Sequence, residues 1–276
     1  MTPATFSSLV EARYQNHTAN AQDGPHTPTI ELLLRHQSVR KFLSDALPPN
    51  ALEMFVAAGQ SASTSSMLQN WSLIAIQDLA HKDAVATLCG DQDFIRQAPL
   101  FLIFCTDLHR MSHLCEKYNQ TGEALDKLDL FMQGTLDAAI AAQNITIAAE
   151  SLGLGVCYVG AARNNAAQLA QLLRIPERCA PVFGLAVGKP DPVSNPPAIK
   201  PRLPIGEVLH RERWNDDRQD ELIASYDDAL GAFYFGQEKL GRKTWSDHTS
   251  RHVSTTNLDG REVYRTTLGN RGFKLD

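Results

Sequence analysis

The stretch "ALDKLDLFMQGTLDAAIAAQNITIAAESLG", residues 124–153, is the longest regular segment of this 276-residue chain. It predicts one long helix that stops at Gly153, because glycine in the left-handed conformation is a common helix terminator. A helix that is apolar nearly all round must be buried on several sides. One subunit of this size rarely surrounds so long a helix, so we expect a subunit interface here. The apolar residues are Leu125, Leu128, Phe131, Met132, Leu136, Ala139, Ile140, Ala142, Ile145 and Ile147.

Short apolar runs on both sides of this helix predict buried strands, because they are too short for helices. They are "WSLIAIQ" (71–77), "LFLIFCT" (100–106), "VCYVG" (156–160) and "VFGLAVG" (182–188). Other helices are predicted after Thr27-Pro28, after Pro48-Pro49, over 164–173 and around 219–235. Because strands and helices mix without strict alternation, the pattern favours an α+β fold over a Rossmann fold.

The chain reads as a short leader followed by one domain. Residues 1–26 contain one possible helix, "SSLVEARY", and then the polar stretch "NHTANAQDGPH". The domain proper is expected over 27–276, where Thr27 suits the N-cap and Pro28 the first helical turn. We expect the C-terminal end of the domain, about 25 residues, to be an extended tail.

The totals exclude several classes of protein. With 26 basic and 31 acidic residues, the net charge of −5 gives no general attraction to nucleic acid or to a membrane surface. Every apolar stretch is too short to span a membrane, and the amino terminus lacks the pattern of a secretory signal. Five cysteines without a C-x-x-C pair indicate a reduced, cytoplasmic protein.

Two short basic segments are candidates for an anion site. "LLLRHQSVRKF" (32–42) places His36, Ser38 and Arg40 after an apolar run, and "KPRLP" (200–204) presents Lys200 and Arg202 beside a stiff proline. An anion site needs a hydroxyl, a backbone turn and a cation that converge on one point. Each segment alone is typical of a solvated surface, but the pair suggests a phosphate clamp.

The polar loop "SASTSSMLQNW" (61–71) is a weaker candidate. It lacks the G-x-S-x-G pattern of a nucleophile elbow, and clusters of serine and threonine are usually loops or helix caps. The functional alternative is a wall of hydroxyls and amides beside a polar ligand, to which Gln69 and Gln92 contribute donors and acceptors. No side-chain nucleophile is recognisable.

Two further patterns are incomplete. His109 and His113, with Cys115 nearby, lack a third anchor at a recognisable spacing, and His248 and His252 repeat the pattern, so no metal site is expected. The glycines of "GLGVCYVGAARNN" do not match G-x-G-x-x-G, so this is no dinucleotide fingerprint. Gly160 after a strand would instead let a flat ligand approach the backbone.

Taken together, these segments resemble the nitroreductase family of flavoenzymes, in particular its bacterial branch of oxygen-insensitive NADPH nitroreductases and NADPH–flavin reductases. The resemblance covers most of residues 27–250, in the family's order. It rests on "TPTIELLLRHQSVRKF", "ASTSSMLQNWSLI", "AAQNITIAAESLGLGVCYVGAARNN", "VFGLAVGKP", "KPRLP" and "KTWSDH".

The resemblance implies a nitroreductase-like fold: a central, mostly antiparallel sheet flanked by helices in an intertwined homodimer with a long buried interface helix. FMN would bind non-covalently at that interface. The implied phosphate clamp is His36, Ser38, Lys200 and Arg202, beside Gln37. The implied FMN contacts from a loop of the same or the neighbouring subunit are Ser63, Thr64, Ser65 and Gln69. Gln92 would bond the polar edge of the ring, and the backbone of Tyr158, Val159, Gly160 and Ala161 would approach N5 and the C4 oxygen.

Arg40 matches the cation beside the flavin pyrimidine edge. Arrival of a hydride leaves negative charge over N1 and the C2 oxygen, and a fixed cation stabilises that charge. The family's mechanism is ping-pong: NAD(P)H reduces the flavin and leaves, and an electron acceptor takes its place.

The sequence departs from the family at three places. Gln37 stands where an arginine is common, and Asp91 replaces a small residue. Gly236 falls where the branch carries an arginine that grips the NADPH 2′-phosphate; Lys239, Arg242 and Lys243 lie nearby and are candidates to replace it. NADPH is therefore the favoured donor, and NADH stays open as the alternative.

The resulting prediction is an FMN-dependent NAD(P)H oxidoreductase that acts on nitroaromatics, quinones or related small aromatic acceptors. One alternative is a flavin reductase that supplies free reduced flavin. Another, of a different class, is a flavin-binding or sensing protein with negligible turnover.

Overall fold

The computed structural model describes residues 6–14, 26–194, 198–236 and 244–276. The chain forms two compact units, which we call the helical unit (residues 1–37 and 197–255) and the sheet unit (residues 38–196 and 256–276). The predicted division into a leader over 1–26 and one domain over 27–276 stays a prediction. The helix of the leader, α1, belongs to the helical unit.

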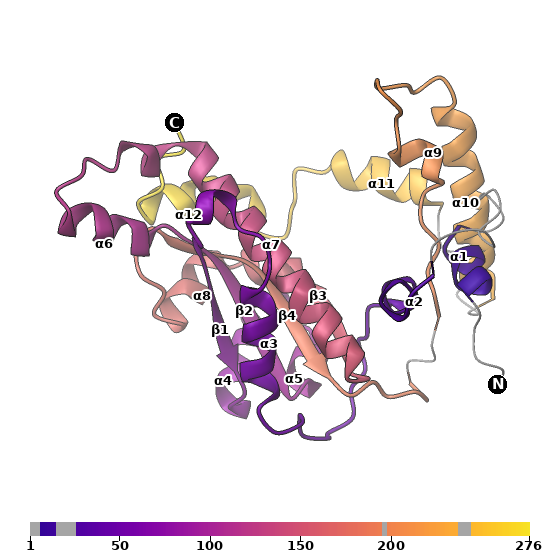
Figure 1. The fold of residues 1–276 in the computed structure, drawn as a ribbon, viewed down its shortest axis with the longest axis horizontal. Helices are drawn as coiled ribbons and strands as arrows, with labels where there is room; N and C mark the ends of the chain where they lie inside the picture. The colour runs from indigo at the N-terminus through magenta and orange to yellow at the C-terminus, as the bar shows by residue number, and fades with distance from the viewer. Residues whose placement is uncertain (1–5, 15–25, 195–197, 237–243) are drawn as a thin grey trace. The chain divides into compact units, whose positions relative to one another are not determined.

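The sheet unit is built on four strands, β1 (Trp71–Ile76), β2 (Leu100–Asp107), β3 (Gly155–Val159) and β4 (Cys179–Gly188). Their order is β1-β2-β4-β3, and every neighbouring pair is antiparallel. All four strands lie where the apolar runs predict them, and the α+β class is confirmed. All eight residues of β2 are buried, so this strand forms the centre of the unit (Figure 1).

Alternate residues of β2 pack against different helices, as the two-residue period of a strand requires. Leu100, Leu102 and Phe104 pack in one cluster with α3 (Ala51–Gln60) and α7 (Leu128–Ser151). Phe101, Ile103 and Cys105 pack in a second cluster with α4 (Leu79–Leu88), α5 (Asp93–Gln97) and α8 (Ala166–Leu172). Helices therefore cover both faces of the sheet.

Helix α7 corresponds to the long helix that the sequence predicts up to Gly153. A short 3-10 turn, η3 (Glu123–Asp126), precedes it, and it ends before Gly153, whose φ is +73°. The face toward the sheet is lined by small residues such as Ala138 and Ala142. Within the single chain an apolar stripe of α7 stays exposed at Leu128, Met132, Leu136 and Ile140, so the expected subunit interface stays a prediction.

The C-terminal end is not the extended tail that the sequence suggests. It forms a 3-10 turn, η5 (Arg261–Val263), and helix α12 (Tyr264–Asn270). Leu268 and Phe273 are buried in a third cluster with Leu108, Leu125 and Ala180. The few apolar residues in this polar stretch are enough to dock it on the sheet unit. Helix α6 (His109–Lys117) packs against the same cluster through Met111 and Cys115.

The helical unit contains α1 (Phe6–Tyr14), α2 (Pro28–Arg35), α9 (Ile205–Val208), α10 (Gln219–Phe235) and α11 (Trp245–Val253). The Thr27 hydroxyl accepts a hydrogen bond from the Ile30 amide at 3.3 Å, which confirms the predicted cap. The sequence suggests a charged tail here, but the residues form α11. The Thr244 hydroxyl caps this helix by accepting a hydrogen bond from the Asp247 amide. None of the helices described is long and apolar enough to cross a membrane.

Candidate functional site

The basic residues of "KPRLP" lie on an extended segment of the helical unit, just before α9. Pro201 is buried, and its carbonyl accepts a hydrogen bond from the Tyr226 hydroxyl at 3.2 Å. The side chains of Lys200 and Arg202, on either side, are exposed. The segment is therefore fixed through its backbone and leaves both cations available to an anion.

Each of these cations is also oriented locally. The Lys200 ammonium lies 5.5 Å from the centre of the Tyr234 ring, a distance typical of a cation–π contact. The Arg202 guanidinium donates to the carbonyls of Lys200 and Pro201, both at 3.2 Å. Its remaining N–H groups can serve a ligand, since a guanidinium has five.

Gln37 joins the end of α2 to the same segment. Its side-chain oxygen accepts a hydrogen bond from the Ala198 amide at 2.7 Å. The Gln37 side chain therefore ties the end of α2 to the backbone at Ala198. His36, the C-cap of α2, is half-buried beside it.

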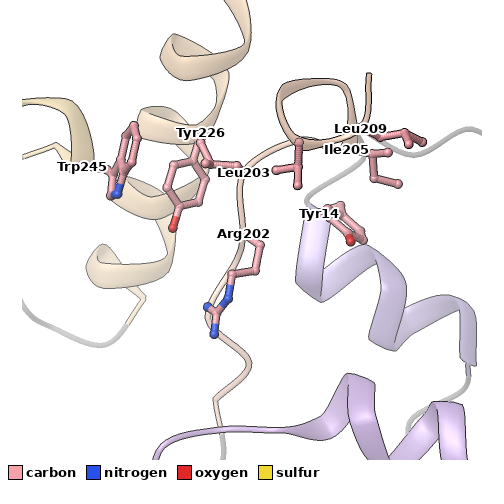
Figure 2. A pocket seen from close by; sticks show the side chains of 8 residues that line it. Tyr14, Arg202, Leu203, Ile205, Leu209, Tyr226 and Trp245 are labelled. Carbon is pink, nitrogen blue, oxygen red and sulfur yellow. The ribbon is translucent and has the colours of Figure 1, made fainter. Parts of the chain in front are cut away.

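A pocket of about 480 Å³ opens next to Arg202 (Figure 2). Figure 2 shows Tyr226 and Trp245 on one side of the arginine and Tyr14, Ile205 and Leu209 on the other. Except for Arg202, the lining is apolar or aromatic. The pocket therefore presents one cation at the edge of a surface suited to a flat organic molecule.

In the sheet unit, the segment Ser38–Arg40 runs beside β3. Ser38 forms an isolated parallel bridge with Val156, and the Val39 amide donates to the Val156 carbonyl at 2.9 Å. Burial raises the pKa of the Cys157 thiol, and the positive charge of the exposed Arg40 opposes this rise. The Arg40 charge therefore acts at β3, next to the predicted ring-binding turn.

That turn is formed by the end of β3 and the 3-10 turn η4 (Gly160–Arg163). Tyr158 is partly exposed, and its hydroxyl accepts a hydrogen bond from Thr146 of α7 at 3.3 Å. Val159 is buried, whereas Gly160 and Ala161 are half-buried. The backbone after Tyr158 is thus partly open to a flat ligand.

Gln92 lies beside this turn. Gly90, at φ +82°, lies between the two, since a Cβ atom there would be 3.2 Å from the Ala161 Cβ and 3.3 Å from the Gln92 Nε2. The Gln92 Nε2 donates to the Cys89 carbonyl at 3.2 Å, which leaves the side-chain oxygen for other donors. The structure therefore brings two of the predicted contacts, Gln92 and Ala161, together.

The negative charge of Asp91, a departure from the family pattern, is compensated locally. Its carboxylate lies 2.5 Å from Arg96, which also pairs with Asp83. These two carboxylates, Asp83 first, raise the pKa of Arg96 further above its usual range. Asp91 is thus part of a surface ion-pair network.

The predicted loop at 61–71 is held by an aspartate that the sequence analysis missed. Asp137 of α7 is 2% exposed; it accepts hydrogen bonds from the Thr64 hydroxyl at 2.6 Å and from the Ser65 amide at 2.9 Å. The Thr64 hydroxyl also accepts from the Gln69 amide at 3.1 Å. Thr64 therefore positions the loop through its side chain. A carboxylate between Leu136 and two alanines, in the middle of the helix, was the available signal.

The backbone of this loop is unusual. Ser66, Met67 and Gln69 all have positive φ, between 49° and 57°, which is uncommon for residues other than glycine. Arg110 of α6 supports the strained end by donating to the Gln69 carbonyl at 2.6 Å. Strain of this kind clusters at functional sites. A pocket of about 660 Å³ lies here, lined by Thr64 and Gln69 among others, while Ser63 and Ser65 are exposed on the loop.

The loop and the β3 turn contact different parts of α7. Asp137, which holds the loop, and Thr146, which contacts Tyr158, are separated by about 14 Å along the helix axis, at 1.5 Å per residue. The predicted ring contacts therefore fall into two groups within the sheet unit.

The remaining candidates are less informative. Lys239, Arg242 and Lys243 lie outside the described residues, and Gly236 is the exposed C-cap of α10. His109 and His113 are exposed on α6. Among the residues that the structure describes, no group of three or more His, Cys, Asp or Glu side chains is placed to hold a metal ion.

Comparison with known proteins gives a consistent picture. Residues 33–189 match the model of the nitroreductase family, and residues 200–276 match that of the nitroreductase family C-terminal domain. The chain is 38% identical to an FMN reductase (NADPH) of Bacillus subtilis over 79% of this chain and 88% of that protein. It is also 38% identical to an oxygen-insensitive NADPH nitroreductase of Salmonella typhimurium, over 84% and 93%. The solved structure of NfrA2 from B. megaterium superimposes with a TM-score of 0.85 at 34% identity, over 91% of this chain and 100% of that one.

Proposed function

Because the chain belongs to the nitroreductase family, we propose that it is an FMN-dependent NAD(P)H oxidoreductase that reduces nitroaromatics, quinones or related small aromatic acceptors. The single observation that carries the proposal is the match to the family over 33–189 and 200–276, with relatives named as NADPH nitroreductases and FMN reductases.

The donors in the chain fit FMN chemically. A phosphate monoester needs cations and hydroxyls, which His36, Ser38, Lys200 and Arg202 would supply. The flavin ring needs donors and acceptors for its polar edge, and Gln92 with the turn from Tyr158 to Ala161 would supply them. Ser63, Thr64, Ser65 and Gln69 would contact FMN of the same or of the neighbouring subunit. Lys239, Arg242 and Lys243 are assigned to the NADPH phosphate.

When bound, FMN would supply the redox chemistry of hydride acceptance from NAD(P)H and paired-electron transfer to an acceptor. The protein orients the reactants and sets the electrostatics. Arg40 would hold a fixed positive charge where negative charge builds up at the pyrimidine edge of the ring. No side-chain nucleophile is needed for this chemistry.

A homodimer is part of the proposal. The stripe Leu128, Met132, Leu136 and Ile140 exposes four large apolar residues at four-residue spacing, with 45–57% of each side chain accessible. Residues at this spacing form one face of a helix, and a contiguous apolar face on a protein surface is typical of an interaction site. A second copy of the chain is the occupant that we propose for α7.

A cytoplasmic location is also part of the proposal, because free buried thiols are typical of proteins in a reducing compartment. All five are free, and four of them are buried. Burial raises the pKa of the Cys89 thiol to about 12, so this thiol stays protonated and unreactive.

A visible absorbance spectrum, recorded without oxygen before and after addition of NADPH or NADH, tests the proposal. We expect a flavin band that NADPH or NADH bleaches rapidly, and the faster donor identifies the preferred nicotinamide. A band that persists would instead indicate a flavin-binding protein without turnover. A colourless protein that takes up no added FMN would contradict the proposal.

A second candidate function is reduction of free flavin, favoured by the name of the Bacillus subtilis relative, FMN reductase. Steady-state rates with added FMN as acceptor, compared with rates on a nitroaromatic, separate the two. Saturation at low FMN with poor nitroaromatic turnover would favour the flavin reductase.

A further inference from the structure

A buried arginine in helix α1 connects the segments that carry the predicted phosphate clamp. Arg13 lies in the last turn of α1 and is 7% exposed. Its guanidinium donates to the carbonyl of Lys200 at 2.9 Å, to that of Leu34 at 2.8 Å and to that of His36 at 2.9 Å. Its own carbonyl accepts a hydrogen bond from the Arg202 amide at 2.9 Å. All these residues belong to the helical unit.

This arrangement fixes the backbone at three of the four clamp residues. Because a guanidinium is planar and rigid, it holds the three carbonyls around one small group. Two of these carbonyls lie at the C-terminal end of α2, where helical carbonyls lack partners and a positive charge is favourable. The end of α2 and the segment 200–202 are thereby tied to each other through Arg13.

The position of α1 in the sequence makes this contact specific to this chain's N-terminal segment. Arg13 precedes residue 33, where the match to the nitroreductase family begins. The family pattern therefore supplies His36, Lys200 and Arg202, while a residue outside that pattern holds them in place.

We propose that Arg13 is a positioning residue for binding of the phosphate group of FMN, and that helix α1 is a working part of the cofactor site. This inference rests on the proposed function, because it assumes that the clamp receives a flavin phosphate. The guanidinium acts through the backbone of His36 and Lys200, the Arg13 carbonyl holds the Arg202 amide, and the clamp side chains make the contact with the phosphate.

The competing explanation is that Arg13 only attaches α1 to the helical unit. Riboflavin separates the two, because it has the same ring system as FMN but no phosphate. Loss of a positioning residue weakens FMN binding and spares riboflavin binding. Loss of a merely structural residue lowers the melting temperature and leaves the preference for FMN over riboflavin unchanged.

The experiment measures the Kd of FMN and of riboflavin for the full-length apoprotein by flavin fluorescence, in the wild type, Arg13→Ala, Arg13→Lys and Arg35→Ala. Arg35→Ala is the matched control, because it removes the same charge one residue before His36. The exposed Arg35 side chain pairs with Glu31 at 3.6 Å. We expect Arg13→Ala to reduce the preference for FMN over riboflavin at least about tenfold, as the loss of one charge-assisted network would. Arg35→Ala should leave that preference within about twofold of the wild type, because exposed ion pairs contribute little.

Arg13→Lys keeps the charge but cannot hold three carbonyls around a plane, so it should also reduce the preference, and it serves if Arg13→Ala does not fold. Folded Arg13 variants that keep the wild-type preference for FMN over riboflavin would overturn the role of Arg13 and leave the proposed function standing. The inference would also fail if Arg35→Ala lowered the preference as much as Arg13→Ala does. A wild type that binds FMN no more tightly than riboflavin would contradict the phosphate clamp itself, and the role of Arg13 with it.

Discussion

The two units of this protein hold their candidate binding residues by different means. In the sheet unit, these residues lie around the four-stranded sheet, in which the inner strand β2 is buried throughout. In the helical unit, Lys200 and Arg202 lie on a segment without regular structure, held by hydrogen bonds from Arg13 and Tyr226 to its backbone. In the first group, apolar packing positions the strands, and hydrogen bonds with Asp137 and Arg110 fix only the loop at 61–71. In the second group, hydrogen bonds to the backbone hold the segment.

This difference has a functional meaning. Core packing is cooperative, so damage to the sheet unit should appear first as a loss of stability. Damage to individual polar contacts in the helical unit should appear first as a loss of ligand affinity, because each contact contributes only a small part of the folding free energy. The predictions below test this distinction.

The largest effect is expected in the core of the sheet unit. Phe104 is fully buried and stacks between Trp71 and Phe183, with ring centres 6.3 Å and 5.0 Å apart. Phe104→Ala should reduce the free energy of unfolding by about 4 kcal/mol, the cost of a large cavity. Urea denaturation measures it. Leu79→Ala, at a side chain that is 74% exposed on α4, is the control and should cost less than about 0.5 kcal/mol; similar losses in both variants would mean that β2 is not the centre of the unit's stability.

The exposed stripe on α7 should control self-association. Leu136→Asp places a charge on an apolar face, so we expect association at least about hundredfold weaker, or about 3 kcal/mol, with little effect on the monomer. Sedimentation velocity at several protein concentrations gives the result. Leu79→Asp, on the opposite face of the sheet, should remain as associated as the wild type. A Leu136→Asp variant that still dimerises like the wild type would remove α7 from the interface.

Asp137 should link stability to the conformation of the loop. Asp137→Asn keeps the shape of the side chain but removes one of the two acceptors used by Thr64 and Ser65, which should cost about 2 kcal/mol. Limited proteolysis within 61–69 should become faster in the variant. Asp129→Asn, at an exposed aspartate of the same helix, is the control. Unchanged proteolysis would show that the loop does not depend on the carboxylate.

In the helical unit, the effect should fall on the ligand. Arg202→Ala removes one cation of the proposed clamp and should weaken FMN binding by about 2 kcal/mol while leaving the melting temperature nearly unchanged. Fluorescence titration with FMN measures the affinity. Arg218→Ala, an exposed arginine of the same unit that pairs with Glu221, should bind FMN like the wild type. Equal FMN affinity in all three proteins would refute the phosphate assignment.

The smallest effect concerns the docked C-terminal end. Asp126 accepts hydrogen bonds from Lys274 and from Arg178, the latter at 2.8 Å, and these cations, Lys274 first, lower its pKa below the ordinary value of 3.8. A folded-state pKa below the unfolded one stabilises the protein above that ordinary value, and the contribution is lost as the pH falls through the folded pKa. Asp126→Asn should therefore cost about 1 kcal/mol at neutral pH and progressively less below pH 4, because the pair is partly exposed. Denaturation curves at several pH values test this; a difference that does not depend on pH would contradict the ion-pair origin.

The sequence analysis predicted the regular elements well where apolar residues follow a clear period. All four strands and α7, α8 and α10 lie within a few residues of their predicted positions. It failed for α11 and α12, because their apolar residues are sparse and the segments read as charged tails. Periodicity also showed that α7 is apolar nearly all round, but it did not show what covers the stripe that the single chain leaves exposed.

The candidate site divides in the same way. The sequence by itself determined the strands, the long helix and the residue types that a flavin would need, because these depend on local pattern and side-chain chemistry. Only the tertiary structure decided that Asp137 holds the Thr64 loop, that Gln92 lies beside Ala161 and that Arg13 ties His36 to Lys200. The residues that these contacts join lie between 23 and 187 positions apart in the chain. Such pairings are set by how the helices and strands pack, and no local pattern of residues encodes them.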